Sequence, residues 1–126
     1  MRSLPWALGV LFLVAMHARA TPAEYDQAML GLATRSGCMV CHTLEAAPRR
    51  ADGLPPIAPA WHDVALRYRN DPAAHERLAR TVLDGSNPQA RHWAGKVGVV
   101  AMPPNALAIG DADARALVNW ILVLVP

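Results

Sequence analysis

Apolar residues along this chain recur at helical spacing, and no segment shows the strict alternation of a half-buried strand. The stretch Thr21-Pro22-Ala23-Glu24 has the residues of a helix start. It offers a capping hydroxyl, a proline at the first helical position and a glutamate at the third. The apolar positions that follow at helical spacing are Tyr25, Met29, Leu32 and Ala33. Gly37 is expected to end this first helix.

Three more helices are expected further along the chain. A short amphipathic helix is predicted by Trp61, Val64, Ala65 and Tyr68. A cap and a proline at Asp71-Pro72 start the next helix, which should continue to Gly85. Asp111 is expected to cap the last helix, whose apolar positions are Leu117, Val118, Ile121, Leu122 and Leu124. Its apolar end, 120–125, is far shorter than the roughly 20 residues that span a bilayer, so we expect it to pack on the first helix.

Two segments lack a helical period and are expected to be loops. One is the proline-rich stretch from Pro48 to Pro59. The other covers residues 86–104, which carry glycines and prolines. A loop of that length in a compact domain is usually functional or disordered. The whole pattern predicts an all-α chain.

Residues 1–20, MRSLPWALGVLFLVAMHARA, have the features of a signal peptide. Arg2 supplies a positive start, an apolar stretch runs from Leu4 to Met16, and Ala18-Arg19-Ala20 fits a cleavage site. An uncleaved membrane anchor is the alternative. We expect cleavage, export to an oxidising compartment, and one mature domain over residues 21–126 that does not span a membrane.

Composition excludes several classes of protein. The 126 residues are 53% hydrophobic and 17% charged, which is typical of one folded domain. The formal net charge of +2 disappears with the export segment, since Arg2 and Arg19 lie there and no acidic residue does. A neutral mature chain has no general attraction for nucleic acid or anionic lipid. Two cysteines are too few for a disulfide-rich scaffold.

The candidate chemistry is concentrated in Cys38-Met39-Val40-Cys41-His42, the C-x-x-C-H pattern of c-type haem attachment. On a helical turn, residues i and i+3 share one face, so two thiols can add to two vinyl groups on one porphyrin edge. His42 then becomes the proximal ligand of the iron. There are three alternatives: a thiol–disulfide redox pair, half of a zinc site, or a chance match. The βαβ pattern that usually accompanies a redox pair is not visible here. Such a zinc site would need His62, His75 or His92.

A second iron ligand is offered by Met102, in the segment Met102-Pro103-Pro104-Asn105. A thioether favours ferrous iron, and the paired prolines restrict the backbone that carries it. The alternative is that Met102 only fills the core.

The chain resembles the class I cytochromes c, in their small bacterial form with one haem. The matching pieces are Gly37–His42, Ile57–Trp61, Asp63–Ala65, Leu78–Ser86, Trp93, Met102–Asn105 and Ala116–Ile121. The resemblance implies an all-α class I fold of about four short helices around one covalently bound haem c. It implies axial ligation by His42 and Met102, and a Pro59 carbonyl that accepts from the histidine. It further implies that Trp93 donates to a haem propionate and that Asn105 hydrogen-bonds near the methionine sulfur.

The chain departs from the pattern of this family in two places. Ala58-Pro59 stands where the family often has Gly-Pro, and the loop 86–101 is longer than usual, with 87–92 as extra residues. The extra segment makes His92 a conceivable iron ligand or propionate partner, besides its interpretation as a solvated loop histidine.

The function expected from these features is one-electron transport in the periplasm. The protein would pass electrons, through weak encounters, between a respiratory or dehydrogenase donor and a terminal oxidase or reductase. We expect a monomer that is not an enzyme and binds no nucleic acid. The alternatives are a haem enzyme or sensor with a displaceable distal ligand, and a dedicated subunit of a larger redox complex.

Overall fold

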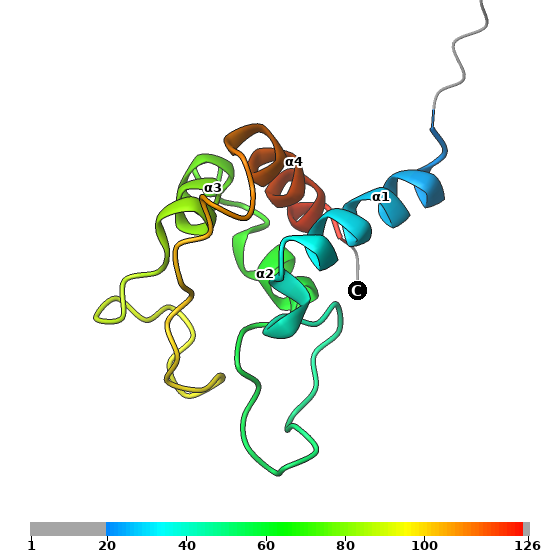
Figure 1. The fold of residues 1–126 in the computed structure, drawn as a ribbon. Coiled ribbons are helices and arrows are strands. Elements are labelled where there is room, and N and C mark those ends of the chain that lie inside the picture. Colours follow the sequence, from blue (N-terminus) through cyan, green and yellow to red (C-terminus); the bar gives the residue numbers. More distant parts are fainter. Residues whose placement is uncertain (1–19, 125–126) are drawn as a thin grey trace, which may run out of the picture.

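The computed structural model describes residues 20–124. The predicted export segment, apart from Ala20, and Val125 of the predicted apolar end therefore lie outside the described residues. The described part holds one 3-10 turn and four α-helices and no strand (Figure 1), which confirms the all-α prediction. These elements are α1 (Pro22–Arg35), η1 (Cys38–Val40), α2 (Trp61–Tyr68), α3 (Ala74–Asp84) and α4 (Asp111–Leu122). No described helix is both long enough and apolar enough to cross a membrane.

Helix α1 begins as the sequence predicts. The Thr21 hydroxyl accepts the Glu24 N–H at 3.3 Å, and the Glu24 carboxylate accepts the Thr21 N–H at 2.7 Å. Two donors that a helix start leaves without partners are thereby satisfied. After α1 ends at Arg35, Gly37 takes the left-handed conformation with φ 78°. A glycine adopts this conformation without steric cost, so the chain turns directly into η1.

Two other helix starts differ from their predictions. Asp71 accepts the Ala73 N–H at 2.9 Å, but this bond closes a turn, and α3 begins only at Ala74. Asp111 does not cap α4: it is the first helical residue, and Gly110 is the extended cap, without a side-chain bond. The Asp111 carboxylate instead accepts from Arg115, one helical turn on, at 2.8 Å. An acidic side chain in the first turn also complements the helix dipole.

Helix α4 packs against all three other helices (Figure 1). The predicted contact with α1 is confirmed, and it includes a 2.8 Å hydrogen bond from the Trp120 indole N–H to Asp26. Contacts with α2 and α3 make this helix more central than predicted. The buried core consists of Leu32, Ala33, Trp61, Ala79, Val82, Ile109, Ala114, Leu117, Val118, Trp120 and Ile121.

Two long loops extend from the helices, one over residues 41–60 and the other over residues 85–110. Figure 1 shows that both loops lie on the same side of the helical assembly. They are joined where the Gly98 N–H donates to the Pro56 carbonyl oxygen at 2.8 Å. The predicted loop character of 48–59 and 86–104 is confirmed, and both segments contribute walls to one cavity.

Candidate functional site

A cavity of about 380 Å³ lies between the two loops and the helices. Cys38, Cys41, His42 and Met102, which are dispersed over 65 residues of sequence, all line it. Much of the remaining wall is apolar, with Ile57, Val64, Leu78, Val82, Val97, Leu117, Val118 and Ile121. A pocket with apolar walls and a few polar groups is suited to a largely apolar ligand.

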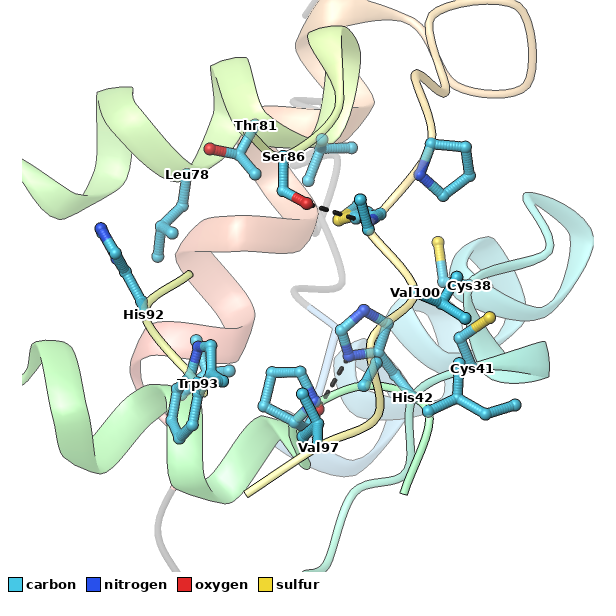
Figure 2. A pocket seen from close by; sticks show the side chains of 18 of the residues that line it. Cys38, Cys41, His42, Leu78, Thr81, Ser86, His92, Trp93, Val97 and Val100 are labelled. Carbon is cyan, nitrogen blue, oxygen red and sulfur yellow. Dashed lines mark hydrogen bonds between the residues drawn. The ribbon is translucent and has the colours of Figure 1, made fainter. Parts of the chain in front are cut away.

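The two thiols lie on one tight turn at one end of this cavity (Figure 2). The N–H groups of Cys41 and His42 both donate to the Cys38 carbonyl oxygen, at 3.2 and 3.0 Å. Both cysteines are free and half-buried. The turn therefore presents two thiols and the following imidazole to the same space, as the C-x-x-C-H spacing predicts.

The surroundings of Cys38 do not favour thiolate chemistry. Burial raises the pKa of the Cys38 thiol above its usual value, against a smaller lowering by a backbone hydrogen bond. Redox-active thiol pairs depend on a lowered pKa, so a thiol–disulfide function is disfavoured. Among residues 20–124, no cluster of three or more histidine, cysteine or acidic side chains could hold a metal ion, which leaves the zinc alternative without support.

His42 is oriented by a hydrogen bond from its Nδ1 to the Pro59 carbonyl oxygen, at 2.8 Å. Since a carbonyl only accepts, the proton is on Nδ1, and the lone pair is on Nε2. Figure 2 shows that second nitrogen directed into the cavity. Burial lowers the pKa of His42, and the bond to Pro59 only partly offsets this effect. Burial thus favours the neutral imidazole, the form that can ligate a metal, and the bond to Pro59 fixes its outer nitrogen.

Met102 is anchored to Ser86 by two reciprocal hydrogen bonds. The Met102 N–H donates to the Ser86 hydroxyl, and the Ser86 N–H donates to the Met102 carbonyl oxygen, both at 2.9 Å. In Figure 2, Ser86 lies across the cavity from His42. Met102 is half-buried and packs against the core. The sequence pattern predicts no separate role for Ser86, although a serine just after a helix-ending glycine is a signal for a local turn.

Gly85 leaves room for this anchor. Its backbone has φ 85° and ψ 168°, a region that is essentially restricted to glycine. A Cβ at this position would lie 2.9 Å from the Met102 carbonyl oxygen and 3.0 Å from the Pro104 nitrogen. The segment that carries Met102 thus packs directly on Gly85, where a side chain would clash with it.

Gly85→Ala is therefore expected to destabilise the protein by about 1–3 kcal/mol from backbone strain alone, with a further loss from the clash. The control is Gly95→Ala, because Gly95 also has a positive φ, of 80°, but a Cβ there meets nothing within 4 Å. Denaturant titration of the two holoproteins measures the difference. Equal losses for both variants would show that the close approach to Met102 has no energetic weight.

Asn105 makes different contacts from those that the family resemblance implies. Its Nδ2 donates to the carbonyl oxygens of Pro103, at 2.7 Å, and Val82, at 3.2 Å. Both amide protons are thus engaged, and a bond to the Met102 sulfur is not among the hydrogen bonds of the described residues. Its backbone N–H also donates to Val82 and Leu83. In this structure, Asn105 ties the methionine loop to the end of α3.

Trp93 and His92 line the other end of the cavity, away from the cysteines (Figure 2). The Arg67 guanidinium lies 5.1 Å from the centre of the half-buried Trp93 ring, within cation–π range. His92 is exposed, and its Nδ1 shares a 2.9 Å hydrogen bond with the Tyr68 hydroxyl. Figure 2 shows His92 beside Trp93 and not across the cavity from His42, where Ser86 lies, and this position disfavours His92 as an iron ligand.

The residues around the cavity fit a haem c. Two free thiols lie on one turn, a neutral imidazole directs one nitrogen inward, and a methionine is held from the other chain segment. The walls between them are largely apolar, as the faces of a porphyrin require.

Comparisons with known proteins agree with this fit. The cytochrome c family model matches residues 31–124. A cytochrome c-551 of Allochromatium vinosum is 45% identical over 104 residues, covering 82% of this chain and 94% of that protein. A cytochrome c-552 of Nitrosomonas europaea is 35% identical over 102 residues, covering 81% of this chain and 84% of that protein. The crystal structure of wild-type Nitrosomonas europaea cytochrome c552 superposes with a TM-score of 0.58 at 33% identity, covering 75% of this chain and 96% of that chain.

The family match covers most of the chain, and the helical fold and the residues around the cavity agree with it. The resemblance found in the sequence is thereby confirmed. The chain belongs to the cytochrome c family, as a small class I member with one covalently attached haem c.

Proposed function

We propose that this protein is a periplasmic one-electron carrier in which thioether bonds from Cys38 and Cys41 hold the haem. His42 and Met102 would ligate its iron. The observation that carries the proposal is that one cavity brings these four side chains together. When bound, haem c supplies an iron that alternates between the ferric and ferrous states.

The two ligand positions differ in how the chain supports them. The Pro59 carbonyl orients His42 and keeps its inner nitrogen available. Ser86 fixes the backbone of Met102 by two bonds, and Asn105 secures the loop behind it. A methionine held in this way raises the reduction potential relative to a second imidazole. A methionine ligand would also occupy the position that a small molecule needs on the iron, which favours a carrier over an enzyme or sensor.

The propionate end of the haem is assigned to the region of Trp93. Its indole N–H is the donor in this proposal, and Arg67 over the ring keeps that side chain in place. Arg77, Arg91 and His92 also line the cavity, so it offers further basic and hydrogen-bonding groups to carboxylates. Asn105 contributes to the site by holding the loop of Met102.

Export and partner binding complete the proposal. Residues 1–20 act as a cleaved signal peptide, and residues 21–126 form the mature cytochrome domain. The mature chain is a monomer that meets its redox partners through small, short-lived interfaces. Its balanced charge implies modest electrostatic steering.

A spectroscopic redox titration of the purified holoprotein tests the carrier function. We expect a reversible one-electron transition and, in the oxidised form, the weak long-wavelength band of thioether-ligated iron. We also expect the reduced form to bind carbon monoxide slowly, because Met102 has to leave first. Rapid binding of carbon monoxide by the reduced protein would instead indicate an enzyme or a sensor.

The first residue of the protein recovered from the periplasm tests export. We expect Thr21, and a chain that keeps residues 1–20 would contradict cleavage of the signal peptide.

A further inference from the structure

The His42 ring has a second neighbour besides Pro59. The rings of His42 and Trp61 are stacked, with centroids 5.7 Å apart and planes inclined by 28°. Trp61 is only 3% exposed, so it has little freedom to leave this arrangement. Offset stacking is a geometry that aromatic rings prefer. Helical periodicity does not predict this contact, because it places Trp61 only among the apolar positions of a short helix.

Backbone hydrogen bonds hold Trp61 beside the attachment turn. The Trp61 N–H donates to the Thr43 carbonyl oxygen at 2.9 Å, and the His62 N–H donates to the Leu44 carbonyl oxygen at 3.0 Å. The first turn of α2 is thus tied to the two residues that directly follow His42. This connection fixes where the Trp61 side chain starts relative to the imidazole.

A side chain of α4, itself held by a side chain of α1, packs against Trp61. The Trp120 ring of α4 meets it nearly edge-on, with centroids 5.7 Å apart and planes at 83°. The Trp120 indole N–H in turn donates to the Asp26 carboxylate of α1 at 2.8 Å. A continuous series of contacts therefore runs from the surface of α1 to the His42 ring.

The bond to Pro59 alone leaves one freedom to His42. A hydrogen bond at Nδ1 fixes one edge of the ring, but the ring plane can still turn about the direction of that bond. A second ring stacked on one face restricts this turn. We propose that Trp61, supported by Trp120 and Asp26, is a positioning residue that sets the plane of the His42 imidazole. The inference rests on the proposed role of His42 as an iron ligand.

The proton NMR spectrum of the oxidised holoprotein tests this inference. The shifts of the haem methyl resonances depend on the plane of the axial imidazole, whereas overall stability alone does not set them. We expect Trp61→Leu to change the spread of these resonances and to shift the reduction potential. Trp61→Phe keeps a stacked ring and should retain the wild-type pattern.

Two variants of Asp26 test the same contacts from the exposed residue at which they begin. Asp26→Ala removes the acceptor of the Trp120 N–H, and we expect a smaller change of the methyl pattern in the same direction as for Trp61→Leu. Asp26→Asn keeps an acceptor oxygen and should restore the wild-type spectrum. Tyr25→Ala, at the neighbouring exposed position of α1, is the matched control and should have no effect. This pair gives an answer even if Trp61→Leu does not fold.

Leu32→Ala separates positioning from stability. Leu32 lies on α1, is buried in the hydrophobic core and does not line the cavity. Its truncation therefore destabilises the fold without removing a neighbour of the His42 ring. An equal change of the methyl pattern in Leu32→Ala and Trp61→Leu would overturn the inference, as would a wild-type pattern in both Trp61→Leu and Asp26→Ala. Either result would leave the proposed function intact, because the redox titration and carbon monoxide binding of the wild-type protein test that function separately.

Discussion

A chain in which alanine replaces both Cys38 and Cys41 is expected to lack native tertiary structure. Without thioether bonds it retains no covalent haem, and the cavity that the haem would fill stays open. The apolar walls of this cavity of about 380 Å³ would then lose the ligand that covers them. A typical domain is stable by only about 5–15 kcal/mol, so the loss of this packing is a large part of its free energy of unfolding. The remaining core is too small to offset such a loss.

Near-ultraviolet circular dichroism measures this effect directly, since Trp61 and Trp93 both line the cavity. We expect the double variant to lose the tryptophan signals of the native protein. Val40→Ala is the control, because Val40 lies on the same turn but is 78% exposed. It should keep both the haem and the native spectrum. A native-like spectrum of the haem-free chain would show that the helices fold without the cofactor.

Met102→Ala is expected to keep the covalent haem but to lose sulfur ligation. The long-wavelength band of the oxidised form should disappear, the reduction potential should fall, and the reduced form should bind carbon monoxide rapidly. Removing this half-buried side chain should also cost about 2 kcal/mol of stability, the lower end for methionine-to-alanine changes in cores.

Met29→Ala distinguishes ligation from packing in this experiment. Met29 also packs partly buried against the core, but it lies on α1 and does not line the cavity. It should lose stability while its absorption spectrum and carbon monoxide binding stay those of the wild type. If Met102→Ala kept the long-wavelength band, another residue would be the distal ligand.

Features that depend on neighbouring residues were predictable from sequence. The capping box at Thr21 and Glu24 involves residues three apart, and both of its bonds are present. The turn at Cys38 is likewise local, since it needs only the glycine before it and the spacing of the thiols. The helix starts at Asp71 and Asp111 were less well predicted. Several backbone conformations accept an aspartate near a helix start, and sequence alone does not select one.

Contacts between distant segments were not predictable in the same way. The stacking of Trp61 on His42 depends on how α2 docks onto the residues after the attachment turn. The reciprocal bonds of Ser86 and Met102 depend on where a long loop returns to α3. The family resemblance implied a hydrogen bond of Asn105 near the methionine sulfur, whereas its amide protons go to two backbone carbonyl oxygens. These details follow from tertiary packing, which a periodic pattern does not encode.

The central claim is that Cys38 and Cys41 hold a haem covalently, and extraction of the purified protein with acidified acetone tests it most directly. We predict that the colour stays with the precipitated polypeptide and that the intact mass exceeds that of the mature chain by one haem. Replacement of either cysteine should leave at most one thioether bond. A colourless protein, or one whose pigment passes entirely into the acetone, would contradict the account.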